Sequence, residues 1–252
     1  MMDALGFKGI WKKPGHKAEE ITQMLQAIAD FHGAILKSAL AELESLNVEP
    51  NIKMSFLSDT VVIGVSLNMK DAANNEHATH LAALLASQFA SAVQLIASQA
   101  KYPLAYRGAI SMGDFVINHP FIVGPAVDDA ASHMEMADAA VVWTTPSLRD
   151  HLEQQEVDNE FLFRFRVPLK GLGMYDTYVV NPFGYCGSGE DVAEATRSIM
   201  KTMTGVYNVA VDMKRQNTSM LDAVGMAMNG TYDNPMFPTI KMLREKGTLP
   251  IF

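Results

Sequence analysis

The sequence predicts an α+β fold, in which a βαββαβ core is followed by an αβαββ segment and a C-terminal helical extension. Two observations lead to this prediction. In two long stretches, apolar residues recur at three- and four-residue spacing, which is typical of amphipathic helices. Between and after these stretches lie short runs rich in β-branched residues, which are typical of strands. The chain has 252 residues, 48% of them hydrophobic, which is enough for one large domain with an extension.

The core elements can be placed from the amino end by periodicity and by turn signals. They are expected at residues 1–7 (end of a strand), 18–46 (helix), 51–67 (hairpin), 77–99 (helix) and 104–117 (strand or hairpin). Pro50 is expected to separate the first helix from the hairpin, whose tight turn is Ser58-Asp59. This order is the ferredoxin-like pattern.

The remaining elements are expected at residues 126–137 (helix), 139–143 (strand), 146–152 (helix), 161–167 (strand) and 175–180 (strand). Gly187-Ser188-Gly189 is interpreted as a flexible link. Residues 1–183 are therefore predicted to form one domain, large enough to be a catalytic domain. Residues 184–252 are predicted to be a helical extension, with helices at 190–215 and 220–228, that packs on the core or on a partner subunit.

Composition narrows the class of protein. The formal net charge is -8, which argues against a general nucleic-acid surface. Cys186 is the only cysteine, so no internal disulfide framework is expected, and this fits a reducing cytoplasm. No secretory signal pattern opens the sequence, and no stretch is interpreted as the roughly 20 apolar residues that span a bilayer. A cytoplasmic protein is expected.

Two acidic residues interrupt apolar runs, Asp3 in the first strand and Asp59 at the hairpin tip. A carboxylate among apolar residues is costly unless something pairs with it, and a divalent cation is one such partner. In the ferredoxin-like pattern the first strand neighbours the third and runs antiparallel to it. The end of the first strand and the start of the third then lie at one sheet edge, so we expect Asp3 and Asp59 to meet. Taken singly, each is more typical of an ordinary strand-end or turn aspartate than of a metal ligand, and it is the pair in register that indicates a site.

Five short motifs, in order over about residues 1–181, resemble those of the class III nucleotidyl cyclases. They are Asp3-Ala4-Leu5-Gly6-Phe7 (first metal motif), Ser58-Asp59 (hairpin aspartate), Arg107-Gly108-Ala109-Ile110-Ser111-Met112-Gly113 (central strand), Gly124-Pro125-Ala126-Val127 with Glu135 (dimer-face helix) and Pro168-Leu169-Lys170-Gly171 (closing strand pair). The variants are most similar to the Pycsar branch, bacterial antiphage cyclases that make cyclic UMP or cyclic CMP for a separate effector.

The resemblance implies a homodimer with shared active sites and two Mg²⁺ or Mn²⁺ ions. It assigns the metals to Asp3, Asp59 and the backbone carbonyl of Ala4. The amides of Leu5, Gly6 and Phe7, which lead towards a helix, are expected to bind phosphate oxygens. In the family, one ion activates the ribose 3′-hydroxyl and the other holds the triphosphate.

The resemblance also locates the residues expected from the partner subunit. The family's transition-state Asn and Arg correspond to Asp129 and His133 when Glu135 is the anchor, which is the preferred register, or to Asp128 and Ser132 when Gly124 is. Either way the Arg is missing. The cations expected against the triphosphate are Lys170, Arg166 and Arg164, of which Lys170 lies in a matched motif and the two arginines share one strand face.

Base choice follows from two positions where adenylate cyclases carry a Lys and an Asp. Here they are Ser55 and either Phe121 or Ile122, so neither purine-reading charge is present, and a pyrimidine is expected, with UTP as the first guess and CTP as the second. The alternative is a catalytically inactive cyclase-fold protein that binds a nucleotide or a partner as a regulator. A ferredoxin-like nucleic-acid binder is disfavoured by the negative charge.

Overall fold

The computed structural model describes residues 1–5, 7, 10, 15–45, 48–69, 75–102, 104–118, 121–154, 161–182 and 184. The predicted extension, with its helices at 190–215 and 220–228, its link at 187–189 and Cys186, lies outside these residues. The described part forms a mixed α+β fold of nine strands and four helices.

In chain order the elements are β1 (Met2–Leu5), α1 (Ala18–Ser45), β2 (Val48–Leu57), β3 (Thr60–Met69), α2 (Asn75–Gln99), β4 (Ala105–Ile110), β5 (Val116–Asn118), β6 (Phe121–Val123), α3 (Pro125–Met134), β7 (Val142–Thr144), α4 (Pro146–Glu153), β8 (Leu162–Leu169) and β9 (Gly173–Val180). This order contains the predicted βαββαβ and αβαββ series. Between them lies the β5–β6 hairpin, of which β6 was not predicted.

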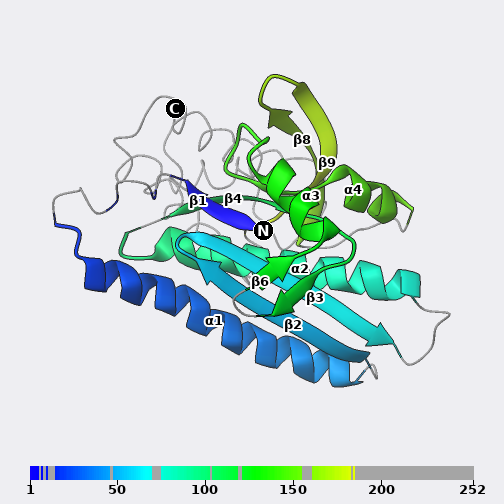
Figure 1. Ribbon diagram of the computed structural model, residues 1–252, viewed down its shortest axis with the longest axis horizontal. Coiled ribbons are helices and arrows are strands. Elements are labelled where there is room, and N and C mark those ends of the chain that lie inside the picture. The colour runs from blue at the N-terminus through cyan, green and yellow to red at the C-terminus, as the bar shows by residue number, and fades with distance from the viewer. Residues whose placement is uncertain are drawn as a thin grey trace, which may run out of the picture.

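Seven of the strands form one sheet in the order β2-β3-β1-β4-β7-β9-β8, and β5 pairs with β6 alone. β1 is antiparallel to both of its neighbours, β3 and β4, whereas β4 and β7 are parallel. The predicted antiparallel contact between the first and third strands is therefore confirmed. The β8–β9 hairpin lies at the opposite end of the sheet from β2 and α1 (Figure 1).

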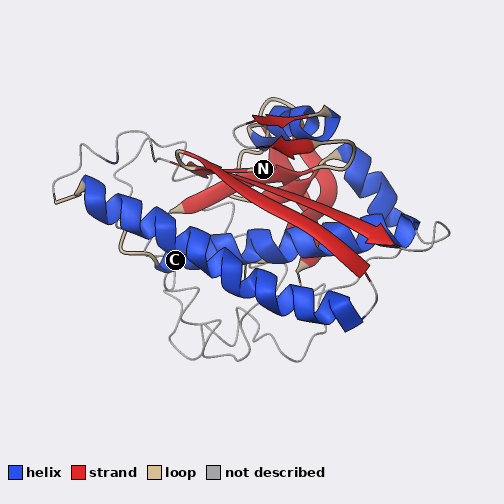
Figure 2. Cartoon of the chain, turned by 60° about the horizontal axis from the view of Figure 1, so that its bottom comes forward, coloured by secondary structure: helices blue, strands red, loops and turns tan. Residues whose placement is uncertain are grey.

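The two long helices, α1 and α2, cover one face of the sheet, and α3 lies on its other side (Figure 2). The core between them includes Met2 and Ala4 of β1, Ile21 and Ile28 of α1, and Val61 of β3. Because alternate residues of a strand point to opposite faces, Met2 and Ala4 face the helices and Asp3 faces away from them.

Part of α2, Ala78–Ala97, is long and apolar enough to cross a membrane by length and composition, which differs from the expectation drawn from the sequence. In the fold this segment is the central core helix. It packs against β3 and β4, and 56% of it is buried inside the protein. Burial against the sheet explains its apolar character.

The prediction that Pro50 precedes the hairpin is wrong, because β2 begins at Val48 and Pro50 pairs with Leu67 inside the strand. The reason is the place of β2 at the outer edge of the sheet. Proline lacks an N–H and cannot donate a ladder hydrogen bond, but on an edge strand its nitrogen can face the side where no neighbouring strand needs a donor.

Candidate metal and nucleotide site

The β2–β3 hairpin and β1 bring Asp3 and Asp59 together. Leu57 pairs with Thr60, so Ser58 and Asp59 form a two-residue turn, and Ser58 takes the positive φ of 61° that such turns require. Across the sheet Asp3 is in register with Thr60, the residue that follows Asp59. The Thr60 hydroxyl donates a 2.9 Å hydrogen bond to the Asp3 carboxylate. Two carboxylates therefore lie close together at the ends of neighbouring strands, as their places in the chain predicted.

Negative charge accumulates at these strand ends. Burial raises the pKa of Asp59 above its ordinary value of 3.8, and the charge of Asp3 raises it further, while hydrogen bonds from the Asp59 backbone amide and from Ser58 oppose the shift. A divalent cation would relieve this repulsion. Within the described residues no group of three or more His, Cys, Asp or Glu side chains is placed to hold a metal ion.

The donor set nevertheless fits Mg²⁺ or Mn²⁺. Hard cations prefer oxygen ligands, and Mg²⁺ usually keeps several waters and is bound through one or two carboxylates together with substrate phosphates. Asp3 and Asp59 supply that number of carboxylates, and nothing in the set is a soft ligand. The site thus fits a metal that arrives with a phosphate-bearing substrate better than a closed structural metal site.

Arg107 is a neighbour of this site; its sequence motif predicted a place in the central strand but no role at the site. It lies on β4 directly opposite Asp3 and, as an opposed pair in antiparallel strands, shares its face of the sheet. The side chain is only 7% exposed, and its Nε has no hydrogen-bond partner among the described residues. A charged residue inside the otherwise apolar strand Ala105–Ile110 was the available signal. It places a buried cationic residue opposite Asp3 in the sheet.

The loop after β1, which is expected to bind phosphate, is described only in part. Leu5 pairs with Ala105 as the last residue of β1, and the Phe7 amide donates to the Ala4 carbonyl at 3.4 Å. Gly6 lies outside the described residues. The first α-helix, α1, begins at Ala18, as its periodicity predicted.

The side chains of Asp129 and His133 form hydrogen bonds and an ion pair with residues of the same chain. Their side chains pair at 3.0 Å between Oδ1 and Nδ1, and the other Asp129 oxygen accepts hydrogen bonds from Thr145 (2.7 Å) and Ser147 (3.1 Å). The imidazole edge also contacts Trp143, with ring centroids 5.6 Å apart. The pair from the other register, Asp128 and Ser132, lies on the exposed face of α3.

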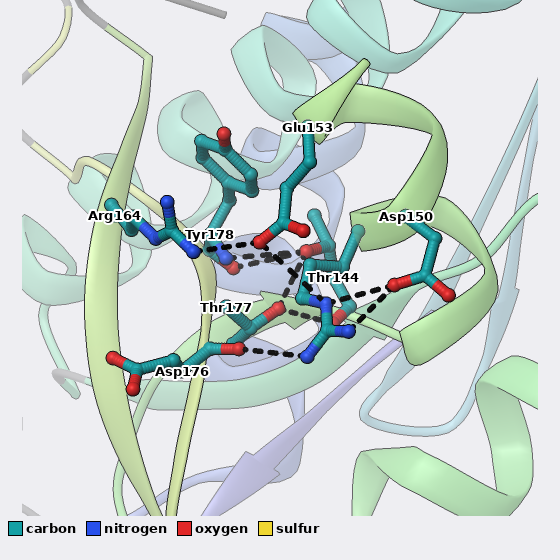
Figure 3. Close-up of polar contacts among 8 residues, drawn as sticks. Thr144, Asp150, Glu153, Arg164, Asp176, Thr177 and Tyr178 are labelled. Atoms are coloured by element: carbon teal, nitrogen blue, oxygen red, sulfur yellow. Dashed lines mark hydrogen bonds and ion pairs between the residues drawn. The ribbon is translucent and has the colours of Figure 1, made fainter. Parts of the chain in front are cut away.

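The cations of β8 are engaged in surface contacts. Arg164 pairs with Glu153 of α4 at 2.7 Å, as Figure 3 shows, and Arg166 lies 3.8 Å from Asp176. Lys170 is exposed in the β8–β9 turn, where its backbone amide donates to the Met136 carbonyl. Four strand steps, roughly 19 Å, separate β8 from β1. The fold of one chain therefore does not bring these cations to Asp3 and Asp59.

The positions expected to read the base lie where the β5–β6 hairpin meets the β2–β3 hairpin. Ser55 is half-buried on β2, on the same face as Lys53, whose ammonium donates to the Ile117 carbonyl of β5 at 3.1 Å. Ile117 is paired with Ile122 of β6, which is also half-buried. The Lys53 ammonium is therefore engaged with a backbone carbonyl of β5.

No protein-family model matches the chain, and no curated protein matches it. Among solved structures, the chain is similar to the catalytic core of a rhodopsin-guanylyl cyclase with converted specificity, in complex with ATPαS. The two are 15% identical, with a TM-score of 0.46, and the match covers 71% of this chain and 90% of that chain.

Proposed function

We propose that this chain is a metal-dependent nucleotide cyclase, which converts a nucleoside triphosphate to a 3′,5′-cyclic nucleotide and diphosphate. The observation that supports the proposal best is the carboxylate pair. Asp3 of β1 and Asp59 of the β2–β3 turn lie close together, and burial and the charge of Asp3 raise the pKa of Asp59. Such a pair is unfavourable without a cation, and the oxygen donors suit a hard divalent metal.

In this proposal Asp3, Asp59 and the Ala4 carbonyl hold two Mg²⁺ or Mn²⁺ ions. When bound, the ions would lower the pKa of the ribose 3′-hydroxyl and neutralise phosphate charge. The bond from the 3′-oxygen to the α-phosphorus forms as the bond from that phosphorus to the β-phosphate oxygen breaks, and the hydroxyl proton goes to water. The Thr60 hydroxyl keeps the Asp3 carboxylate oriented. Leu5, Gly6 and Phe7 are assigned to the phosphates by motif resemblance.

The proposal includes a homodimer with shared sites. Lys170, Arg166 and Arg164 are well placed to neutralise a triphosphate only if they come from a second copy, because about 19 Å of sheet separates them from β1 in one chain. Asp129 and His133 are assigned to the same partner surface. For Arg164 and Arg166 this requires that their contacts with Glu153 and Asp176 open, which is inexpensive for exposed ion pairs.

For the base we propose a pyrimidine, UTP first and CTP second. Ser55 and Ile122 carry no charge, and the nearby Lys53 ammonium is bound to Ile117. A pocket without the purine-reading groups leaves the polar edge of adenine or guanine unpaired, which discriminates strongly. A role in antiphage defence, through a separate effector that senses the cyclic nucleotide, is proposed on the motif resemblance alone.

One observation favours a second function, that of a catalytically inactive regulator which binds a nucleotide or a partner. His133 is assigned to the position of the family's transition-state Arg. Its side chain pairs with Asp129, whose carboxylate also accepts hydrogen bonds from Thr145 and Ser147 of the same chain. A side chain with these partners is poorly placed to reach a phosphate on another subunit.

The test incubates the purified protein with each of the four nucleoside triphosphates and MnCl₂, and separates the products by chromatography. A cyclic pyrimidine nucleotide is expected, and it should disappear in Asp59→Ala. The matched control is Asp30→Ala, an exposed carboxylate on α1, which should keep full activity. Binding of a nucleotide without any cyclic product would replace the cyclase proposal with the regulator. Product from Asp59→Ala would refute the metal assignment.

A further inference from the structure

Six large apolar side chains are more than half exposed in the described part of the chain, and all of them lie on hairpins. They are Leu57, Val116, Phe121, Val123, Leu172 and Met174. The first four lie on the β2–β3 and β5–β6 hairpins, and we call them the ribbon patch. The last two lie on the β8–β9 hairpin, and we call them the turn patch. Exposed apolar residues scattered singly need no explanation, but a set confined to hairpins indicates an interaction surface.

The β5–β6 hairpin is apolar on both of its faces. Its inner face packs on β3 and β2, where the Ile117 carbonyl accepts a 3.1 Å hydrogen bond from the Lys53 ammonium. On its outer face Val116 is opposed to Val123, and Phe121 is 67% exposed. Because the inner face is fixed to the sheet, the outer face is already in place for a partner, which lowers the cost of binding.

The turn patch is also held in place by backbone contacts. Leu172 is 67% exposed and Met174 is 54% exposed. Gly171 between the two strands takes a φ of 73°, which a glycine adopts without strain. The Lys170 amide donates to the Met136 carbonyl at 2.9 Å, which joins this turn to the segment after α3. The two apolar side chains are therefore presented by a fixed turn.

Charges of opposite sign lie beside the two patches. Asp59 is in the turn that directly follows Leu57 of the ribbon patch. Lys170 is in the same turn as Leu172 of the turn patch, and the side chain of Arg166 on that hairpin is 68% exposed. An apolar residue beside a carboxylate on one hairpin thus matches an apolar residue beside cations on the other, which favours their contact and fixes its register.

We propose that the ribbon patch of one copy of this chain docks on the turn patch of a second copy, and that the same contact forms again across a two-fold axis. Within one chain the patches cannot meet, because four strand steps, roughly 19 Å, separate β3 from β9 (Figure 1). A two-fold rotation pairs both patches of each copy at once, so the assembly closes at two copies.

The area and the charge both favour a second copy as the occupant. At roughly 100 Å² of exposed apolar surface per side chain, six side chains give about 1,200 Å² for the pair of copies, the lower limit of a specific interface. A membrane is disfavoured, because the net charge is -8 and Asp59 would enter the lipid beside Leu57. The inference rests on the homodimer of the proposed function and names its contact surface.

The first experiment cross-links the two patches in the full chain, without nucleotide or metal. Cys186→Ser removes the only cysteine, and Leu57→Cys and Leu172→Cys then place one thiol on each patch. With a short bismaleimide the doubly substituted chain should give one covalent dimer, and each singly substituted chain at least about tenfold less. Asp30→Cys on exposed α1, used in place of Leu57→Cys, is the control and should give almost none. A ladder of larger species would refute the two-fold closure, and no cross-linked product would refute the docking.

Sedimentation velocity at micromolar concentrations measures the association directly. Phe121→Asp and Leu172→Asp should each raise the Kd of the dimer at least about tenfold, because each puts a charge into an apolar contact. Their circular dichroism spectra should match the wild type, since both side chains are exposed. Unchanged dissociation constants would overturn the proposal. A monomeric wild type that binds phosphatidylcholine vesicles would assign the patches to a membrane instead.

Cyclase assays on the same samples separate this inference from the proposed function. A cross-linked dimer that forms no cyclic product from any nucleoside triphosphate would refute the cyclase and leave the interface standing. Cyclic product from a chain that neither cross-links nor dimerises would refute the interface and leave the cyclase standing.

Discussion

Asp59→Asn is expected to abolish cyclase activity while making the protein more stable at neutral pH. Burial and the charge of Asp3 raise the pKa of Asp59 in the folded chain, and the unfolded chain restores the ordinary value of 3.8. The stability contribution of this group is therefore fully present below pH 3.8 and is lost as the pH rises through the folded pKa. At pH 7 the carboxylate is charged and opposes folding. An amide of the same shape removes that penalty.

The size of the effect follows from charge separation and exposure. Two like charges about 4 Å apart in water repel by about 1 kcal/mol, and by less at larger separations. Asp59 is half-exposed, so solvent screening reduces this to roughly 0.5–1 kcal/mol. For a chain of this size, that corresponds to a rise in melting temperature of about 2 °C.

Thermal unfolding at pH 7 and at pH 4, with and without MnCl₂, measures this directly. Without metal, Asp59→Asn should melt above the wild type at pH 7, and the gap should narrow at pH 4, because the raised pKa of Asp59 leaves more of the folded wild-type carboxyl protonated there. MnCl₂ should stabilise the wild type more than the variant, since a ligand stabilises only the state that binds it. Asp30→Asn serves as the control and should show neither change. A gap that is the same at both pH values would refute the electrostatic reasoning.

Three further substitutions test the surroundings of the site. Arg107→Met removes the buried cation opposite Asp3. The affinity for Mn²⁺, measured by titration, should therefore rise about threefold to tenfold, while the affinity for the triphosphate falls. An unchanged Mn²⁺ affinity would show that this cation does not act on Asp3. Gly108→Ala puts a Cβ against the backbone of β1, 2.9 Å from the Met2 Cα, and should lower the melting temperature by roughly 5 °C; a change under about 1 °C would mean that β1 yields freely. Asp129→Ala removes the partner of His133, Thr145 and Ser147 and should cost about 1–2 kcal/mol in chemical denaturation, whereas exposed Asp128→Ala should cost almost nothing; equal costs would contradict the inward placement of Asp129.

The meeting of Asp3 and Asp59 could be predicted from the sequence because it depends on element order alone. Two helices and a hairpin with clear periodicity fix which strands are neighbours, and both residues sit at strand ends. The role of Arg107 could not be predicted in this way. Its position opposite Asp3 depends on the register of β1 with β4, which a strand of four residues does not encode by periodicity.

Other features escaped prediction because they are properties of the whole fold. The strands β5 and β6 have three residues each, too few to show alternation. Pro50 marks a chain break in most contexts, and only the edge position of β2 makes it compatible with a strand. The spacing of Asp129 and His133 shows that they share a helix face, but the direction of that face depends on Thr145 and Ser147, which come from another segment.

The two outer strands of the sheet have a consequence for self-association. β2 carries Pro50 and Glu49 along one border, and β8 carries Pro168 together with the exposed Arg164 and Arg166 along the other. Proline and charge on a border strand disfavour fibril-like growth, in which copies join edge to edge through backbone hydrogen bonds. Copies of this chain that associate are therefore expected to meet through a face of the sheet or through its hairpins, and the protein can be concentrated without extending its sheet from molecule to molecule.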